Sequence, residues 1–125
     1  MTTIIFSADH IDCKENDLMN DIAENFLTNS GLSFKKAVGH YTYDNGSSIT
    51  EKTFIVDIPK NLELIIGIIF KMFSQESVLV IDSGNNADLV YSTGGKLSLG
   101  AWTEVKDIKN EKAYTLVNNK YYVAK

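Results

Sequence analysis

The central part of the chain, residues 52–83, reads KTFIVDIPKNLELIIGIIFKMFSQESVLVIDS. Its first segment, KTFIVDI, and its last, SVLVIDS, are rich in β-branched residues and predict two strands. Between them, Pro59 stands where a helix would begin, and the segment that follows predicts a helix that is apolar on nearly all sides. Such a helix needs burial on more than one face, which a small chain hardly provides alone. We therefore expect it to contact another subunit.

The N-terminal part of the chain adds three more elements. Residues 2–8 are apolar and β-branched and predict a strand. Residues 14–31 predict an amphipathic helix, because apolar side chains recur every four residues and acids crowd the first turns. Residues 33–44 alternate well enough for a strand, and the turn signal DNG at 44–46 separates them from the central strand.

The predicted order of the first six elements, βαββαβ, indicates a fold class. It is typical of the ferredoxin-like α/β sandwich, an antiparallel sheet with two helices on one face. After it come four short segments that we expect to be extra C-terminal β-strands, at residues 87–92, 101–107, 112–117 and 120–125. We predict an α+β, ferredoxin-like fold and a single domain over residues 1–125.

Composition limits the function classes. The 125 residues are 44% apolar and 22% charged, as in a folded domain. A net charge of −4 argues against a general nucleic-acid binder, which needs a basic surface. The single cysteine, Cys13, leaves no internal disulfide, and no Cys/His cluster has zinc spacing. Neither a signal peptide nor a membrane-spanning segment is expected, so our interpretation is a cytoplasmic protein without a membrane partner.

Candidate polar residues alone leave the function open. Glu51 precedes the central strand and is either a solvated charge at a strand end or a group that holds a ligand. The loop at 82–88 is rich in turn formers, yet Asn86 and Asp88 in it carry side chains that could hydrogen-bond a ligand. Tyr41 and Tyr43 share one face of a strand, which ordinary packing explains.

Two other patterns carry little chemistry. The segment STGG at 92–95 lacks the Lys-Ser/Thr and the following helix of a phosphate-binding loop, so we interpret it as a hairpin turn. Cys13 and His10 stand close in sequence, but nothing else supports a nucleophile and base there. Trp102 and the pair Tyr121-Tyr122 are expected to pack against the sheet.

Short segments also occur in a distinctive order along the chain. They are FSAD at 6–9, VGHY at 38–41, TEKT at 50–53, VLV at 78–80, LVY at 89–91 and WTEV at 102–105. In order and spacing this series resembles the bacteriophage S-adenosylmethionine lyases, long called S-adenosylmethionine hydrolases. The resemblance spans residues 4–107, and it rests on the series, because each segment alone is unspecific.

This resemblance implies a fold, an activity and an assembly. The family folds as a ferredoxin-like sandwich and assembles as trimers or higher oligomers, with active sites between subunits. Its members convert S-adenosylmethionine to homoserine lactone and 5′-methylthioadenosine without a metal or cofactor. Phages use them in the host cytoplasm to deprive restriction enzymes of that cofactor, which is an anti-restriction role.

The resemblance also implies roles for particular residues. The family's acid maps onto Glu51 and its tyrosine onto Tyr41, and we expect both to be catalytic. A polar residue of the loop after the VLV strand takes part in the family, and here the loop offers Asn86 and Asp88. Adenine and ribose are expected near Ser7 and Ala8 and near the loop at 82–88. Glu104 matches a family position, but a solvated strand acid is the better interpretation of it.

Two alternatives stay open at this stage, and a third, an acidic protein that blocks a host enzyme by contact, is not favoured by a net charge of only −4. The first is hydrolysis of the same substrate to homoserine, although no group here is an evident base for activating water. The second is a trimeric ferredoxin-like module that binds a nucleotide-like ligand between subunits without converting it.

Overall fold

The computed structural model describes residues 1–9 and 15–125. All the predicted segments form the expected type of element, with shifted bounds. In chain order the elements are β1 (Thr2–Ser7), α1 (Asn16–Asn29), β2 (Phe34–Thr42), β3 (Ser48–Ile58), α2 (Leu62–Phe73), β4 (Ser77–Ile81), β5 (Asn86–Tyr91), β6 (Lys96–Val105), β7 (Ala113–Val117) and β8 (Lys120–Ala124). Within this described part, neither helix is long and apolar enough to cross a membrane.

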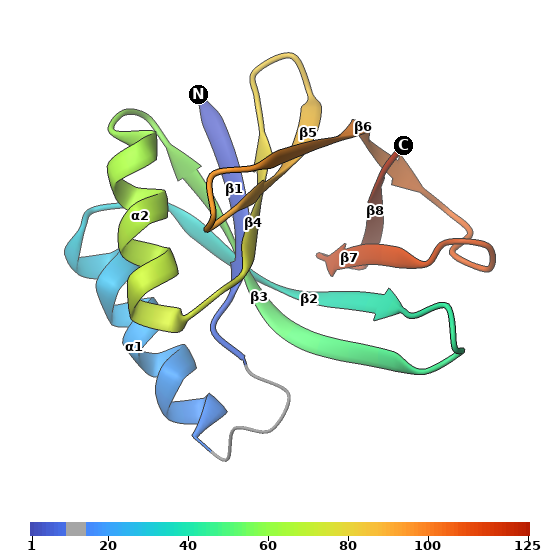
Figure 1. Cartoon of the computed structure of the whole chain (residues 1–125), viewed down its shortest axis with the longest axis horizontal. Coiled ribbons are helices and arrows are strands. Elements are labelled where there is room, and N and C mark those ends of the chain that lie inside the picture. Colours follow the sequence, from blue (N-terminus) through green and yellow to red (C-terminus); the bar gives the residue numbers. More distant parts are fainter. Residues whose placement is uncertain (10–14) are drawn as a thin grey trace.

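The strands close into an eight-stranded antiparallel barrel in the order β1-β3-β2-β7-β8-β6-β5-β4, with β4 pairing back onto β1. The prediction of a ferredoxin-like α/β sandwich is therefore wrong, although the order of the first six elements is as expected. In that fold β2 and β4 would be the edges of an open sheet. Here β7 pairs with β2 and β5 pairs with β4, so the C-terminal strands join both edges into one wall (Figure 1).

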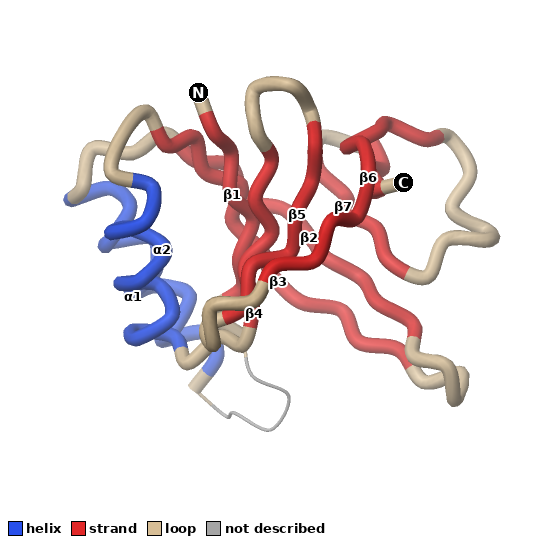
Figure 2. The backbone as a smooth tube through the Cα atoms, turned by 45° about the horizontal axis from the view of Figure 1, so that its top comes forward, coloured by secondary structure: helices blue, strands red, loops and turns tan. Residues whose placement is uncertain are grey.

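The two helices lie together against the outside of one part of the barrel, next to β1, β3 and β4 (Figures 1 and 2). Alternate side chains of these strands point outward and form the main core with the helices. Phe6 is the centre of this core, with ring centroids 5.4 Å from Phe54 of β3 and 5.8 Å from Phe73 of α2. From α1, Ala23 and Leu27 are fully buried against the same strands.

The other side chains of the same strands point into the barrel and fill only one end of it. Ile5, Ile81 and Ala87 form a second buried cluster there, with Trp102 and Leu99 packed against it. At the opposite end the interior stays open. Strands β1, β3 and β4 are therefore covered on both faces, by helices outside and by other strands inside.

The barrel closes next to the end of β8 through a very close approach. Ala101 and Lys125 exchange two backbone hydrogen bonds of 3.0 Å. Gly100, just before Ala101, has φ of +107°, and a Cβ on it would lie 2.6 Å from the carbonyl carbon of Lys125. Only glycine fits there, because both the backbone conformation and the space exclude a side chain.

We expect Gly100→Ala to lower the free energy of unfolding by about 1–3 kcal/mol, because it combines backbone strain with a clash against main chain. The measurement is chemical denaturation of both proteins.

Gly67→Ala is the matched control. Gly67 lies within α2, and a Cβ there meets nothing within 4 Å. The change should raise the stability by about 0.5–1 kcal/mol, because alanine favours the helix. Equal changes in the free energy of unfolding for Gly100→Ala and Gly67→Ala would contradict the requirement for glycine at residue 100.

Candidate functional site

A cavity of about 550 Å³ occupies the open end of the barrel. This is within the usual range for sites that enclose a small molecule. The walls come from all eight strands and the residues next to them. The polar and aromatic lining residues are Phe6, Ser7, His40, Tyr41, Glu51, Thr53, Gln75, Ser77, Tyr91, Trp102, Tyr114, Thr115 and Tyr122.

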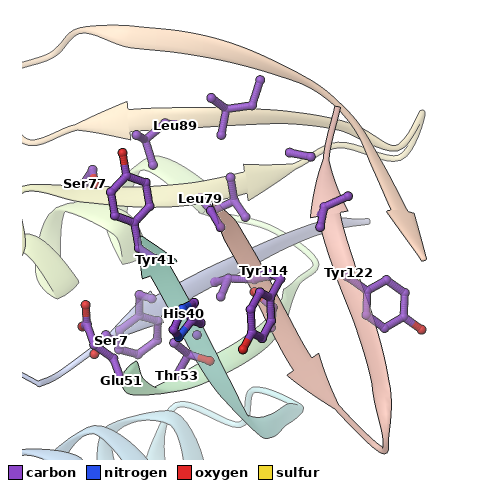
Figure 3. Close-up of a pocket in the computed structure, with 18 of the residues that line it drawn as sticks. Ser7, His40, Tyr41, Glu51, Thr53, Ser77, Leu79, Leu89, Tyr114 and Tyr122 are labelled. Atoms are coloured by element: carbon purple, nitrogen blue, oxygen red, sulfur yellow. The ribbon is translucent and has the colours of Figure 1, made fainter. Parts of the chain in front are cut away.

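Glu51 lines this cavity from β3 (Figure 3). It pairs with Gly39 of β2, and its side chain shares the inward face of β3 with Thr53. The residue is partly buried. Its carboxylate makes no hydrogen bond or ion pair with any residue in 1–9 or 15–125. Neighbouring Lys52 points the other way and pairs with Asp17 at 3.2 Å. A partly buried, unpaired carboxylate is unusual, because burial penalises a charge that lacks a partner.

Tyr41 and Ser7 line the same cavity. The Tyr41 ring stands up from β2 on the cavity side (Figure 3) and remains 45% exposed. It packs edge-on against Tyr43, with ring centroids 5.0 Å apart. Ser7 is buried at the end of β1, where its hydroxyl accepts a 3.0 Å hydrogen bond from the backbone N–H of Asp9.

The charge distribution in the cavity favours a cationic ligand. Among the described lining residues, Glu51 is the one acid, and no lysine lies there. Aromatic residues also line this space, among them Tyr41, Tyr91 and Tyr122. The stack of His40 on Tyr114, with ring centroids 4.8 Å apart, lies on the other face of β2 and β7, because these two residues alternate with Gly39 and Thr115. A single carboxylate and aromatic faces both attract a positive charge.

The other predicted site residues lie elsewhere. Ala8 is fully buried in the core that faces the helices. Asn86 and Asp88 belong to the closed end of the barrel, on either side of Ala87, and neither lines the cavity. Asn86 hydrogen-bonds Asp82 within its own turn, and Asp88 pairs with Lys96 at 3.4 Å. Glu51, Tyr41 and Ser7 are thus brought together, while Ala8, Asn86 and Asp88 are apart from them.

Several lining residues were missed by sequence reasoning. Thr53 was part of the TEKT segment, and its spacing of two from Glu51 would have placed both side chains on one strand face. Tyr91, Tyr114 and Tyr122 come from strands that meet β2 and β3 only through barrel closure, so no local pattern marks them. Trp102 and Tyr122 stack with centroids 5.8 Å apart and form part of the lining.

Two further interpretations from the sequence concern Glu104 and the pair of Cys13 and His10. Glu104 is exposed on β6, 3.7 Å from the Lys120 ammonium and outside the cavity, as expected of a solvated strand acid. Cys13 and His10 lie outside the described residues. Over the described part of the chain, no group of three or more His, Cys, Asp or Glu side chains is placed to hold a metal ion.

The fold and the cavity together define a class of protein. It is an antiparallel barrel with a cavity of a size that suits a small molecule at one end, and the described lining carries one acid and no lysine. Residues 4–125 match the model of the S-adenosylmethionine lyase family, and the chain belongs to that family. This match includes β7 and β8, which follow the segment 4–107 that carries the sequence resemblance. A search of curated proteins found no match.

The loop at the closed end has its own organising residue, Asp82. Its carboxylate accepts hydrogen bonds of 2.9 Å from the backbone N–H groups of Gly84 and Asn86. The hydrogen bond from Asn86 is the main reason that the pKa of Asp82 lies below its usual value of 3.8. The turn is therefore stabilised by the ionised form of Asp82.

We expect Asp82→Ala to lower the melting temperature at neutral pH. Because folding lowers the pKa of Asp82, its stabilising effect is complete above pH 3.8 and is lost as the pH falls through the folded-state value. The difference between the variant and the wild type should shrink across that acidic range. Melting curves measure it, with Ser83→Ala in the same loop as the control. A difference that is independent of pH would contradict this role.

Proposed function

We propose that this chain, as one catalytic domain over residues 1–125, degrades S-adenosylmethionine by intramolecular cyclisation to homoserine lactone and 5′-methylthioadenosine. One observation supports this most directly: the carboxylate of Glu51, which no residue in 1–9 or 15–125 pairs, is the one acid among the described residues of an aromatic-lined cavity. The substrate carries a sulfonium, which is the kind of charge that such a lining attracts. Family membership points to the same substrate.

The reaction needs little chemistry from the protein. An oxygen of the substrate carboxylate attacks Cγ, the C–O bond forms, and the C–S bond breaks with its electron pair going to sulfur. The sulfonium becomes a neutral thioether, and the carboxylate becomes the lactone ester. The nucleophile is already an anion and the leaving group is neutral, so no proton is transferred and no cofactor is required.

The task of the barrel is then to hold a reactive conformation. Placing nucleophile and carbon in line and close contributes roughly 7–11 kcal/mol in the best intramolecular cases. The positive sulfonium and the negative carboxylate of the substrate neutralise each other as the ring forms. Excluding water therefore accelerates the reaction more than an additional charge from the protein would. Consistent with this, no lysine lies among the described lining residues to neutralise the nucleophile.

Glu51 and Tyr41 receive specific roles in this proposal. Glu51 pairs with the sulfonium or the ammonium of the substrate and pins the methionine arm, acting as an orienting anion rather than a base. The Tyr41 ring packs on the cation, an interaction of roughly 0.5–2 kcal/mol. Ser7 lies at the same end and contacts the nucleoside. Ala8, Asn86 and Asp88 stay predicted substrate contacts that this cavity does not include.

The proposal extends to biology and assembly. We infer a phage anti-restriction role in the host cytoplasm, on the sequence resemblance alone. We also infer a homo-oligomer, with a trimer expected and with active sites between subunits. Exposed apolar side chains support an oligomer: Leu64 on α2 and Leu18 on α1 are 64% and 55% exposed, and Tyr41 of the site is itself partly exposed.

The product assay tests the reaction. Purified protein is incubated with S-adenosylmethionine in ¹⁸O-labelled water and sampled early by mass spectrometry. We expect unlabelled homoserine lactone with methylthioadenosine; any homoserine from later lactone opening carries the label in its carboxyl group. Label in the side-chain hydroxyl, without lactone, would show a hydrolase instead. Bound but unchanged substrate would favour the binding module.

Glu51→Gln tests the orienting role. It keeps the shape of the side chain and removes the charge, so kcat/KM should fall about 10–150-fold, the equivalent of one charge-assisted interaction. The melting temperature should not fall, because this carboxylate makes no ion pair with a described residue. Glu63→Gln, an exposed acid in the first turn of α2 and outside the cavity, is the control. If Glu51→Gln converted the substrate at the wild-type rate, the orienting role would be wrong, and Glu51 would be a solvated charge at a strand end.

A further inference from the structure

A buried hydroxyl in the cavity wall has no hydrogen-bond partner among the described residues. The Thr53 side chain is only 9% exposed, and its Oγ1 is buried without a hydrogen bond to any described residue. A buried hydroxyl normally finds a partner, since leaving it unpaired costs free energy. Such a group in a cavity wall is suited to a ligand that supplies the missing bond.

The position of Thr53 places it in the site. It lines the cavity two residues from Glu51 on the same strand face, which corresponds to roughly 7 Å along β3. Across the barrel wall it pairs with Ser7 of β1 and Ala37 of β2. Ser7 already accepts a hydrogen bond from Asp9, and Ala37 has no polar side chain. Neither neighbouring side chain makes a hydrogen bond with the Thr53 hydroxyl, and Figure 3 shows Ser7 and Thr53 at the same end of the cavity.

Gly39 leaves room beside the methyl group of Thr53. A Cβ at residue 39 would lie 3.0 Å from Cγ2 of Thr53, closer than ordinary contacts. The methyl group of Thr53 therefore faces Gly39, and the buried hydroxyl reaches a ligand through a turn about χ1. The glycine of the VGHY segment thus keeps space beside both Glu51 and Thr53.

We propose that Thr53 is a substrate-binding residue whose hydroxyl donates its hydrogen bond to the carboxylate of the substrate. This rests on the proposed function. No lysine among the described lining residues is available for that carboxylate, so neutral donors must hold it. A hydroxyl on one oxygen orients the other toward Cγ without neutralising the nucleophile. When the substrate sulfonium lies at Glu51, the substrate carboxylate, at the end of the same short methionine arm, reaches the position of Thr53.

The experiment compares Thr53→Val, which removes the hydroxyl at nearly constant shape, with Thr53→Ser, which retains it. We expect Thr53→Val to lower kcat/KM at least about tenfold and Thr53→Ser to stay within about threefold of the wild type. The melting temperature of Thr53→Val should equal or exceed that of the wild type, because an unpaired buried hydroxyl has been removed. Thr103→Val, which loses a 3.0 Å bond to Ala101 O outside the cavity, is the control.

A second readout identifies the substrate group. Thermal stabilisation by S-adenosylmethionine should be smaller in Thr53→Val, whereas stabilisation by decarboxylated S-adenosylmethionine should be equal in both proteins. Unchanged kcat/KM in Thr53→Val, or a less stable variant with unchanged KM, would overturn the assignment. So would a loss of binding that is the same for both ligands. A wild-type protein that does not convert the substrate would instead refute the proposed function.

Discussion

Burial of β1, β3 and β4 on both faces is the constraint on which the rest of the structure depends. Their outward side chains, such as Phe6 and Val56, are covered by the helices. Their inward side chains, such as Ile5 and Ile81, need a second cover. The two helices cover only the outward faces of these strands. The C-terminal strands cover the inward faces by closing the barrel. Closure also pairs the edges of β2 and β4, which would otherwise present unsatisfied backbone groups.

The same closure creates an interior with two different ends. Apolar residues and Trp102 fill one end, next to the turn that Asp82 organises. The other end is wide enough for a small molecule because its inward positions carry Glu51, Thr53 and Tyr41 and the glycine that faces Glu51. Within residues 1–9 and 15–125 the Glu51 carboxylate and the Thr53 hydroxyl have no protein partner, whereas the two buried apolar clusters lie in other parts of the barrel.

The separation of an apolar, filled end from a polar, open end suits the proposed reaction. A substrate that carries both its nucleophile and its leaving group needs a container that folds it, not a set of acids and bases. One anion, several aromatic rings and neutral hydroxyls can orient a sulfonium and a carboxylate without quenching either. The rigid wall of β1 and β3, held from outside by the helices, keeps Glu51, Thr53 and Ser7 in fixed relation to one another.

The sequence by itself determined the type and order of every element, since strand alternation, helical periodicity and turn signals such as the asparagines at 118–119 are local. It also marked Glu51 and Tyr41, because their segments resemble those of a family. The tertiary structure decided that the sheet is a barrel, that Asn86 and Asp88 lie at the other end from Glu51, and that Tyr114 and Tyr122 join the lining. These facts depend on which distant strands pair, and pairing is set by the joint burial of both sheet faces, which no local pattern encodes.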